Sequence, residues 1–369
     1  MTATGPRTAP DVDVVETVDV VALGESMVTF LPSRPGPLAD VPSFERAIGG
    51  AESNTACVLA AAGHSARWIS AVGRDGFGDH LLRAIGAYGV DVSSVRRDPH
   101  RPTGVYFRTA GDRASDAHEV AYYRAGSAAS AMTAADVDLE AVRAGRVLHL
   151  SGITAALSPG CLELMRELTA PRPGRPLVSF DVNHRPGLWR DSDARDRGSG
   201  PEVLLELARG ADLVLVGDDE AREAWGLRDA AAVREALPEP EILVVKHGSR
   251  GATAYGPHGA ETFVPSLGVD VVAAVGAGDA FAAGFLSATL RALPVRDRLR
   301  HGHLTAAAAL TVPGDLAAPP ARDLADRLAA LDEAAWGKLR LGPGWTETAT
   351  AGAHTDAGAD RAEEEVRTP

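Results

Sequence analysis

Short runs of apolar, often β-branched residues alternate along this chain with longer stretches that have the spacing of helices. Each short run is typical of a buried strand, and the stretches between the runs are long enough for several helical turns. These runs are expected to be strands of one sheet: Val18–Leu23, Arg67–Val72, Val147–Leu150, Leu177–Asp181, Asp212–Val216 and Ile242–Lys246. Because strands that alternate with helices pair in parallel, the pattern predicts an α/β fold with a mostly parallel sheet.

Two segments depart from this alternation. Residues 103–109 and 118–124 are extended stretches around a polar loop, without a helical stretch between them, and they predict a hairpin apart from the main sheet. Residues 31–47 contain four prolines and are expected to be irregular. After a further hairpin at 252–264, these helices are expected to end the folded part: Asp279–Leu290, Arg296–Thr311 and Ala321–Leu331.

The two ends of the chain lack this pattern. Residues 1–17 are polar and acidic, without the basic and then apolar order of a signal peptide, and are expected to be a loose tail. One folded domain is expected over residues 18–333, and residues 334–369 are expected to be a disordered tail. Residues 191–201 are charged and carry Gly and Ser, which predicts a surface insertion.

Composition narrows the class of protein. The 369 residues carry a formal net charge of −13, which argues against nucleic acid or an anionic membrane as a partner. No apolar run is long enough to span a bilayer. The two cysteines, Cys57 and Cys161, lie far apart and form neither a disulfide framework nor a metal cluster, which fits a reducing cytosol. We therefore expect a cytoplasmic protein.

The strongest chemical signal is the turn Gly276-Ala277-Gly278, which leads into a helical stretch at Asp279. Glycines at a helix start let a ligand approach bare N–H groups, and these groups together with the helix dipole form an anion site, most often for phosphate. A carboxylate at such a place costs free energy unless it has a task, and the obvious task is to take up a proton. The alternative is that Asp279 only caps the helix.

Two long motifs together indicate a family. They are Gly49-Gly50 with Asn54 and then Val72-Gly73-Arg74-Asp75-Gly76-Phe77-Gly78, and Val275-Gly276-Ala277-Gly278-Asp279-Ala280-Phe281 followed by Ala283-Gly284. In order and spacing the chain resembles the ribokinase-like, PfkB-type carbohydrate kinases over residues 18–333. The resemblance implies a three-layer α/β/α fold with a small β-sheet lid within about residues 25–48 and 101–126. It also implies ATP and Mg²⁺ as cofactors and a homo-oligomer formed through the lid.

Within the family the chain is most similar to 2-keto-3-deoxygluconate kinases. The stretches that carry this likeness are Gly24-Glu25-Ser26-Met27-Val28, Tyr122-Tyr123-Arg124-Ala125-Gly126-Ser127-Ala128 and Phe180-Asp181-Val182-Asn183-His184-Arg185-Pro186-Gly187-Leu188-Trp189. A keto-deoxy sugar acid has a carboxylate, which arginine binds through its planar fork. Arg124 and Arg185 are therefore expected to reach the substrate. The alternative is that each arginine forms a local ion pair at the surface.

The resemblance implies the remaining site residues by position. The sugar is expected to contact Gly49, Gly50, Asn54, Tyr106, Tyr122, Arg124, Arg185 and Asp279. The nucleotide and its phosphates are expected to contact Asn183, Arg185, Lys246, Gly248, Gly251, Gly276, Ala277, Gly278 and His303. The tyrosines could instead pack within the lid or at a dimer contact, the loop after Lys246 is also a hairpin turn, and His303 could be structural.

Two departures from the family pattern concern ions. Many members have Asp followed by Thr or Pro before the glycine turn, and this chain has Ala273-Ala274, so a monovalent cation is in doubt. Members also carry an Asn-x-x-Glu motif that is tied to magnesium. Here Glu220 is present and is expected to act on Mg²⁺ through water, with help from Asp218. The Asn position of the motif is occupied by Gly217.

The sequence therefore predicts an enzyme that transfers the γ-phosphoryl group of ATP to a hydroxyl of a sugar or sugar acid. Asp279 is expected to be the general base, and Gly276–Asp279 the anion hole, with 2-keto-3-deoxygluconate as substrate. One alternative is a kinase for a neutral sugar such as fructose. The other is a sugar or nucleotide sensor without turnover, suggested by the changes at Ala273 and Gly217.

Overall fold

The computed structural model describes residues 16–109, 120–189 and 199–347. Its centre is an eight-stranded sheet with the order β14-β13-β12-β11-β10-β9-β1-β4. The strands are β1 (Val18–Leu23), β4 (Ala66–Ile69), β9 (Gly145–Ser151), β10 (Leu177–Asp181), β11 (Leu213–Gly217), β12 (Ile242–Lys246), β13 (Gly251–Tyr255) and β14 (Glu261–Pro265). All neighbours from β4 to β12 are parallel, and β13 and β14 add an antiparallel edge. The mostly parallel sheet predicted from the sequence is thereby confirmed.

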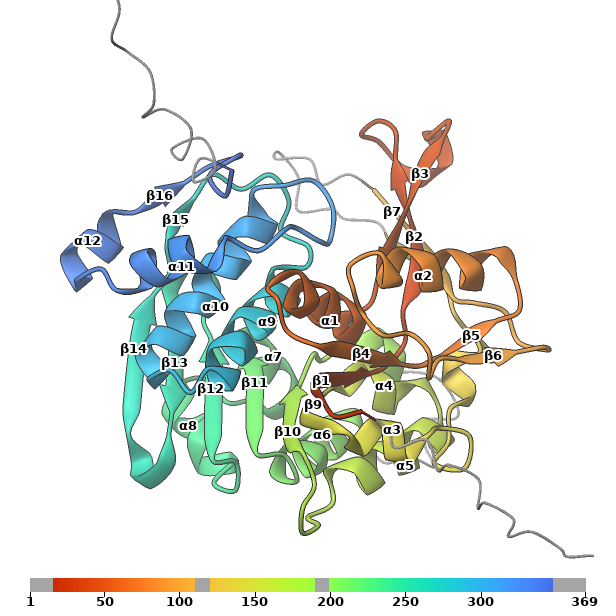
Figure 1. The fold of residues 1–369 in the computed structure, drawn as a ribbon, viewed down its shortest axis with the longest axis horizontal. Coiled ribbons are helices and arrows are strands. Elements are labelled where there is room, and N and C mark those ends of the chain that lie inside the picture. The colour runs from red at the N-terminus through yellow and green to blue at the C-terminus, as the bar shows by residue number, and fades with distance from the viewer. Residues whose placement is uncertain (1–15, 110–119, 190–198, 348–369) are drawn as a thin grey trace, which may run out of the picture.

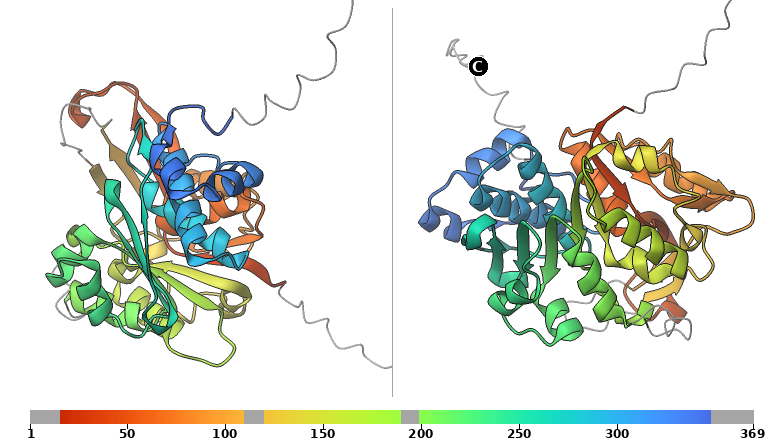
Figure 2. Two further views of the ribbon diagram at one scale, coloured as in Figure 1. Left: turned by 90° about the vertical axis from the view of Figure 1, so that its left-hand side faces the viewer. Right: turned by 90° about the horizontal axis from the view of Figure 1, so that it is seen from below.

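Helices cover both faces of this sheet (Figures 1 and 2). They are α1 (Ala51–Ala61), α2 (Gly76–Gly86), α3 (Leu139–Arg143), α4 (Gly152–Leu157), α5 (Pro159–Thr169), α6 (Gly200–Arg209), α7 (Asp218–Trp225), α8 (Ala230–Ala236), α9 (Ala277–Leu290), α10 (Val295–Leu310), α11 (Arg322–Ala329) and α12 (Glu333–Lys338). Side chains alternate across β1, so Val21 packs into a core with α5 and α6, whereas Val20 packs into a core with α9 and α10. The result is the three-layer α/β/α arrangement of the ribokinase-like fold.

A smaller sheet projects from the main one and has the order β3-β2-β7-β8 (Figure 1). Its strands are β2 (Met27–Pro32), β3 (Phe44–Gly49), β7 (Val105–Arg108) and β8 (Val120–Tyr123). The predicted hairpin is confirmed as the antiparallel pair β7–β8, and residues 110–119 lie outside the described residues. We call this four-stranded sheet the lid.

Two local predictions need correction. Residues 31–47 were expected to be irregular, but β3 begins at Phe44 and pairs with β2 along its whole length, because the prolines lie before it. The expected strand 67–72 is interrupted at Ser70 and continues as the short strand β5 (Ala71–Gly73), which pairs with β6 (Arg96–Asp98). Residues 190–198, which hold most of the predicted insertion, lie outside the described residues.

The folded part extends beyond its predicted end at residue 333. Helix α12 follows directly, and β16 (Arg340–Leu341) pairs with β15 (Gly268–Val269). Trp336 on α12 is fully buried, donates its indole N–H to the carbonyl of Pro265 at 2.9 Å and lies under the Arg300 guanidinium at 4.5 Å. The prediction of disorder was therefore wrong for residues 334–347. Trp336 thus holds in place a segment whose composition suggested a tail. Residues 348–369 lie outside the described residues.

Candidate active site

The candidate site lies at the carboxyl edge of the sheet. Strand β1 pairs with β4 on one side and with β9 on the other. The order in which the chain adds strands to the sheet therefore reverses at β1. In open α/β sheets, ligands bind outside the carboxyl ends of the strands at such a switch point. Helix α1 and helix α9 both begin near this edge and pack against each other, with Thr55 Oγ1 donating to the Asp279 carbonyl at 3.4 Å.

The glycine turn opens helix α9 in the predicted manner. Gly276 is the N-cap with φ of 77°, and a side chain there would place its Cβ 2.1 Å from the carbonyl oxygen of Asp315. Only glycine fits this left-handed, crowded position. Gly276 makes no side-chain cap bond, and the first N–H groups of α9 are those of Ala277, Gly278 and Asp279.

Asp279 is half-buried at the start of α9, and its carboxylate accepts a hydrogen bond from Asn54 Nδ2 at 2.9 Å. It therefore bonds across to α1 instead of capping its own helix. Burial raises the pKa of Asp279 to about 7, with Asp181 and Glu52 adding to the rise while Asn54 and Lys246 oppose it. A carboxyl with a pKa near neutrality is suited to take up a proton from an alcohol.

A second cluster of charges surrounds Lys246 at the end of β12. Its ammonium lies 2.8 and 3.2 Å from the two carboxylate oxygens of Asp181, which ends β10. Burial alone would lower the pKa of Lys246, but Asp181 and Glu220 raise it, so the amine stays charged. A Cβ built at Gly278 would lie 3.9 Å from this ammonium, which places a cation beside the first turn of α9.

Glu220 lies within the same cluster, in the first turn of α7. One carboxylate oxygen accepts from the Gly217 N–H at 2.8 Å, and the other lies 3.5 Å from Arg185 Nη1. Burial raises the pKa of Glu220, and neighbouring Lys246 lowers it. Arg185 is largely exposed, and beside it Asn183 has φ of 41° and a buried Oδ1 without a hydrogen-bond partner among the described residues.

The lid brings tyrosines over this edge. Tyr106 on β7 is buried and donates its hydroxyl to Asp315 at 2.8 Å, while Arg108 Nη2 pairs with the same carboxylate at 2.7 Å. The Tyr106 hydroxyl also lies against Gly49, where a Cβ would approach it to 2.1 Å. Tyr122 on β8 packs on the Tyr106 ring at 5.4 Å and remains 52% exposed.

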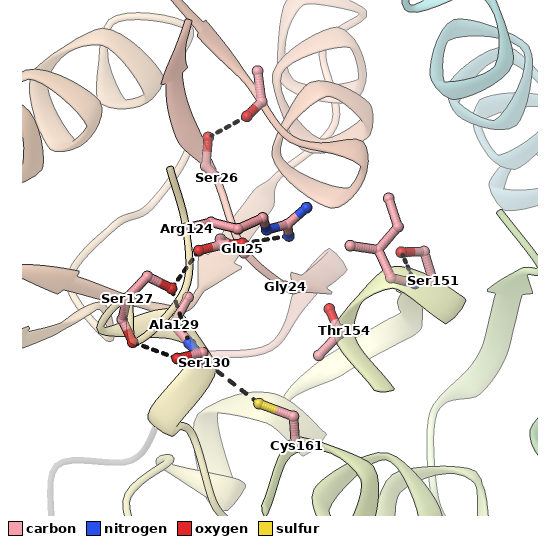
Figure 3. A network of polar contacts seen from close by, with 12 residues as sticks. Gly24, Glu25, Ser26, Arg124, Ser127, Ala129, Ser130, Ser151, Thr154 and Cys161 are labelled. Atoms are coloured by element: carbon pink, nitrogen blue, oxygen red, sulfur yellow. Dashed lines mark hydrogen bonds and ion pairs between the residues drawn. The ribbon is translucent and has the colours of Figure 1, made fainter. Parts of the chain in front are cut away.

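Arg124 follows the last lid strand and forms an ion pair with Glu25, which lies two residues after the end of β1 (Figure 3). Nearby, Glu52 on α1 is fully buried and accepts hydrogen bonds from Ser151 Oγ at 2.7 Å and Thr154 Oγ1 at 3.0 Å. Burial raises the pKa of Glu52. The local ion pair that the sequence left open for Arg124 is therefore present, and it is buried between the main sheet and the lid instead of lying at the surface.

Three predicted nucleotide residues remain to be placed, His303, Gly248 and Gly251. His303 is buried in the core, where a ring nitrogen bonds to the Val264 carbonyl at 3.2 Å and the ring packs edge-on against Phe281 at 5.2 Å. Burial lowers the pKa of His303 to about 4. These contacts give His303 a packing role in the core, and the adenine contact expected for it stays a prediction. Gly248 and Gly251 flank the turn between β12 and β13, with φ of 57° and 137°.

Sequence reasoning missed four acids in and around the site: Glu25, Glu52, Asp181 and Asp315. Asp181 and Glu25 each come at or just after the end of a strand, which was a usable signal because those ends meet at one edge. Asp315 gave no local signal. It lies in the linker between α10 and α11 and reaches the lid only through the tertiary fold.

Known proteins similar to this chain are sugar kinases. The 2-dehydro-3-deoxygluconokinase of Bacillus subtilis (strain 168) is 33% identical over 312 residues, covering 83% of this chain and 94% of that protein. Fructokinase-2 of Zea mays is 33% identical over 276 residues, covering 72% and 78%. The crystal structure of a PfkB protein from Polaromonas sp. JS666 superimposes with a TM-score of 0.71 at 34% identity, covering 81% and 98%. Fold and site thus define an ATP-dependent carbohydrate kinase.

The profile of the pfkB family carbohydrate kinases matches residues 17–322, nearly the whole described part of the chain. The chain belongs to this family. No helix among the described residues is long and apolar enough to cross a membrane.

Proposed function

We propose that this kinase phosphorylates a hydroxyl of 2-keto-3-deoxygluconate or a closely similar sugar acid, with Asp279 as general base. The observation that carries the chemical part is the half-buried Asp279 carboxyl, with its raised pKa, at the uncapped start of α9. The substrate is supported by Arg124, which lies between the main sheet and the lid, and by the likeness to a 2-dehydro-3-deoxygluconokinase.

Phosphoryl transfer requires in-line positioning, neutralisation of charge and a group that takes the hydroxyl proton. Asp279 accepts that proton, and Asn54 holds the carboxylate in place through its hydrogen bond of 2.9 Å. The N–H groups of Ala277, Gly278 and Asp279 donate to the oxygens of the transferring group, each worth roughly 3 kcal/mol when well placed. Lys246, fixed by Asp181, lies beside the same turn and offsets the negative charge.

Mg²⁺ is the metal that the proposal includes. No group of three or more His, Cys, Asp or Glu side chains in the described ranges is arranged to hold a metal. Mg²⁺ with a nucleotide needs only one or two carboxylates, because phosphate oxygens and waters fill its other positions. Glu220 and Asp181 fit that requirement, and the ion would neutralise phosphate charge there. Ala273 and Ala274 supply no carboxylate before the turn, so the proposal includes no monovalent cation.

The lid has two proposed roles. Tyr106 and Tyr122 cover the sugar and exclude water, which otherwise competes as the acceptor. The lid also carries exposed apolar side chains, Val120, Tyr122 and Tyr123, of which Tyr123 is 65% exposed. Such a surface favours self-association of two lids, and the proposal therefore includes a homo-oligomer in the cytoplasm.

The experiment is an ADP-release assay with 2-keto-3-deoxygluconate and fructose, run on the wild type and on Arg124→Ala. We expect the wild type to prefer the sugar acid and Arg124→Ala to lose that preference, with a KM for the acid raised at least tenfold. Arg46→Ala removes an exposed lid arginine and is the matched control. Equal effects of Arg124→Ala on both substrates contradict the sugar-acid proposal.

The second candidate is a kinase for a neutral sugar, which the likeness to a fructokinase favours. The same assay decides it, because a fructokinase turns over fructose well and is indifferent to the charge of Arg124. A sensor without turnover would be stabilised thermally by ligands and release no ADP. The chemistry of Asp279 argues against the sensor, since a raised pKa at an anion site is of no use to simple binding.

A further inference from the structure

The chain passes between the main sheet and the lid four times, and all four passages meet at Glu25. The first passage is Glu25 itself, between β1 and β2. At the second, between β3 and α1, a Cβ at Gly50 would lie 2.5 Å from the Glu25 carbonyl. At the third, before β7, a Cβ at Gly104 would lie 2.9 Å from Glu25 Oε1. The fourth passage, after β8, supplies Arg124 and Ser127, which both contact the Glu25 carboxylate.

The fourth passage is shaped to hold this carboxylate. Arg124 to Ser127 form a tight turn closed by the Ser127 N–H on the Arg124 carbonyl at 3.0 Å, with φ of 70° at Gly126. Ser127 Oγ donates to Glu25 Oε1 at 2.6 Å, and Arg124 Nη2 pairs with the other oxygen, as Figure 3 shows. Ser127 is itself fixed, because its Oγ accepts from the Ser130 N–H at 3.2 Å. Glu25 therefore has a partner on each oxygen.

The arginine, in contrast, is only partly used. Its side chain is 11% exposed and that of Glu25 is 0% exposed, so the pair is well shielded from water. Arg124 Nε is buried and has no hydrogen-bond partner among the described residues. A buried guanidinium nitrogen without an acceptor is costly unless a ligand supplies one. The carboxylate of a sugar acid is such a ligand, because it can bind two nitrogens of one guanidinium.

We propose that Glu25 and Ser127 are positioning residues that hold the Arg124 guanidinium in place to bind the substrate carboxylate. They also connect this binding site to the passages between the main sheet and the lid. Glu25 fixes one guanidinium nitrogen and leaves the others for the substrate. Because the Glu25 carboxylate also contacts the third and fourth passages between the sheet and the lid, a substrate that binds Arg124 also restrains the lid. This inference rests on the proposed sugar-acid substrate, and it assigns specificity to residues that do not contact the phosphates.

The test is steady-state kinetics on Glu25→Gln and Ser127→Ala with the sugar acid and a neutral sugar. Glu25→Gln leaves a buried guanidinium without its counter-charge, so Arg124 turns away toward water. We expect KM for the sugar acid to rise about tenfold in Glu25→Gln and about threefold in Ser127→Ala, with kcat reduced less than KM rises. KM for the neutral sugar should change less than twofold.

Asp91→Asn is the matched control, because Asp91 pairs with the buried Arg67 at 2.7 Å and neither residue belongs to the candidate site. It should leave both KM values unchanged while testing the general cost of unpairing a buried arginine. Glu25→Gln combined with Arg124→Ala should be no worse for the sugar acid than Arg124→Ala alone. Additive losses in the double variant, or a lower KM for the acid in Glu25→Gln, overturn the positioning role.

The two proposals fail in different ways. A substrate error appears in Arg124→Ala itself, which then affects acid and neutral sugar alike. If only the positioning role is wrong, Arg124→Ala still raises KM for the sugar acid alone. Glu25→Gln and Ser127→Ala then have the same KM values as the wild type. Ser127→Ala keeps every charge and removes only one hydroxyl, so its folding is expected to be normal and its kinetics remain interpretable.

Discussion

Replacing Asp279 by asparagine should stabilise the folded protein while it abolishes turnover. The carboxyl is half-buried, and burial raises its pKa from 3.8 to about 7. The folded state therefore holds a proton more tightly than the unfolded chain does, and ionised Asp279 opposes folding at neutral and alkaline pH. Asparagine has nearly the same shape and no charge. Its side-chain oxygen can still accept the hydrogen bond from Asn54, which measures 2.9 Å in the wild type.

The size of the effect follows from the pKa. At about 1.36 kcal/mol per pKa unit, the rise from 3.8 to about 7 corresponds to about 4 kcal/mol for full burial. Because Asp279 is only half-buried, screening by solvent reduces this figure, and we expect roughly 2 kcal/mol. Below pH 4 the carboxyl is protonated in both states, so Asp279→Asn should then match the wild type. Between pH 4 and 7 the advantage of the variant should grow, and above pH 7 it should stay constant.

Urea unfolding of both proteins at a series of pH values measures this difference in the free energy of unfolding, and an ADP-release assay confirms the loss of turnover. Asp181→Asn is not a suitable control because it unpairs Lys246, whereas Asp323→Asn changes an exposed carboxylate that pairs with Arg327 on the same helix. Asp323→Asn should leave the free energy of unfolding nearly unchanged at every pH, because exposed ion pairs contribute little to stability. A stability difference for Asp279→Asn that is independent of pH, or that has the opposite sign, would refute the argument.

Two other substitutions test separate parts of the structure. Lys246→Met removes the cation that lowers the pKa of Asp279, so the pH at which kcat/KM is half-maximal should rise above about 7 by roughly one unit, while Lys246→Arg should leave it nearly unchanged. An unchanged pH profile in Lys246→Met would disconnect Lys246 from the base. Trp336→Ala should lower the free energy of unfolding by about 3–5 kcal/mol in urea, because it empties a fully buried site and removes the contacts to Pro265 and Arg300. A loss below 1 kcal/mol would mean that α12 contributes little to the fold.

The main sheet was predictable because its strands are short apolar runs buried on both faces, a pattern that few other structures produce. Leu177–Asp181 and Ile242–Lys246 have the predicted bounds. The strand β3 was not predictable, because Glu45 and Arg46 are exposed and its pairing with β2 is settled by the lid as a whole. Helix α12 was missed because one tryptophan, and no amphipathic repeat, fastens it.

The parts of the candidate site that require a special backbone conformation were predictable from the sequence. The ion pairs between distant residues were less predictable. The turn at Gly276 requires glycine wherever it occurs, so it is visible in the sequence. The pairing of Lys246 with Asp181 joins residues that are 65 positions apart, and no local pattern announces it. The hydrogen bond between His303 and the carbonyl of Val264 likewise joins distant residues, because it links α10 to strand β14.

The linker between α10 and α11 limits how this enzyme can vary in length. Its Asp315 contacts the glycine turn through its carbonyl, which lies against Gly276, and contacts the lid through its carboxylate, which pairs with Tyr106 and Arg108. Inserting or deleting one residue between α10 and Asp315 would shift both contacts together. Natural length variation and engineered junctions should therefore be tolerated in other surface connections and excluded from this linker.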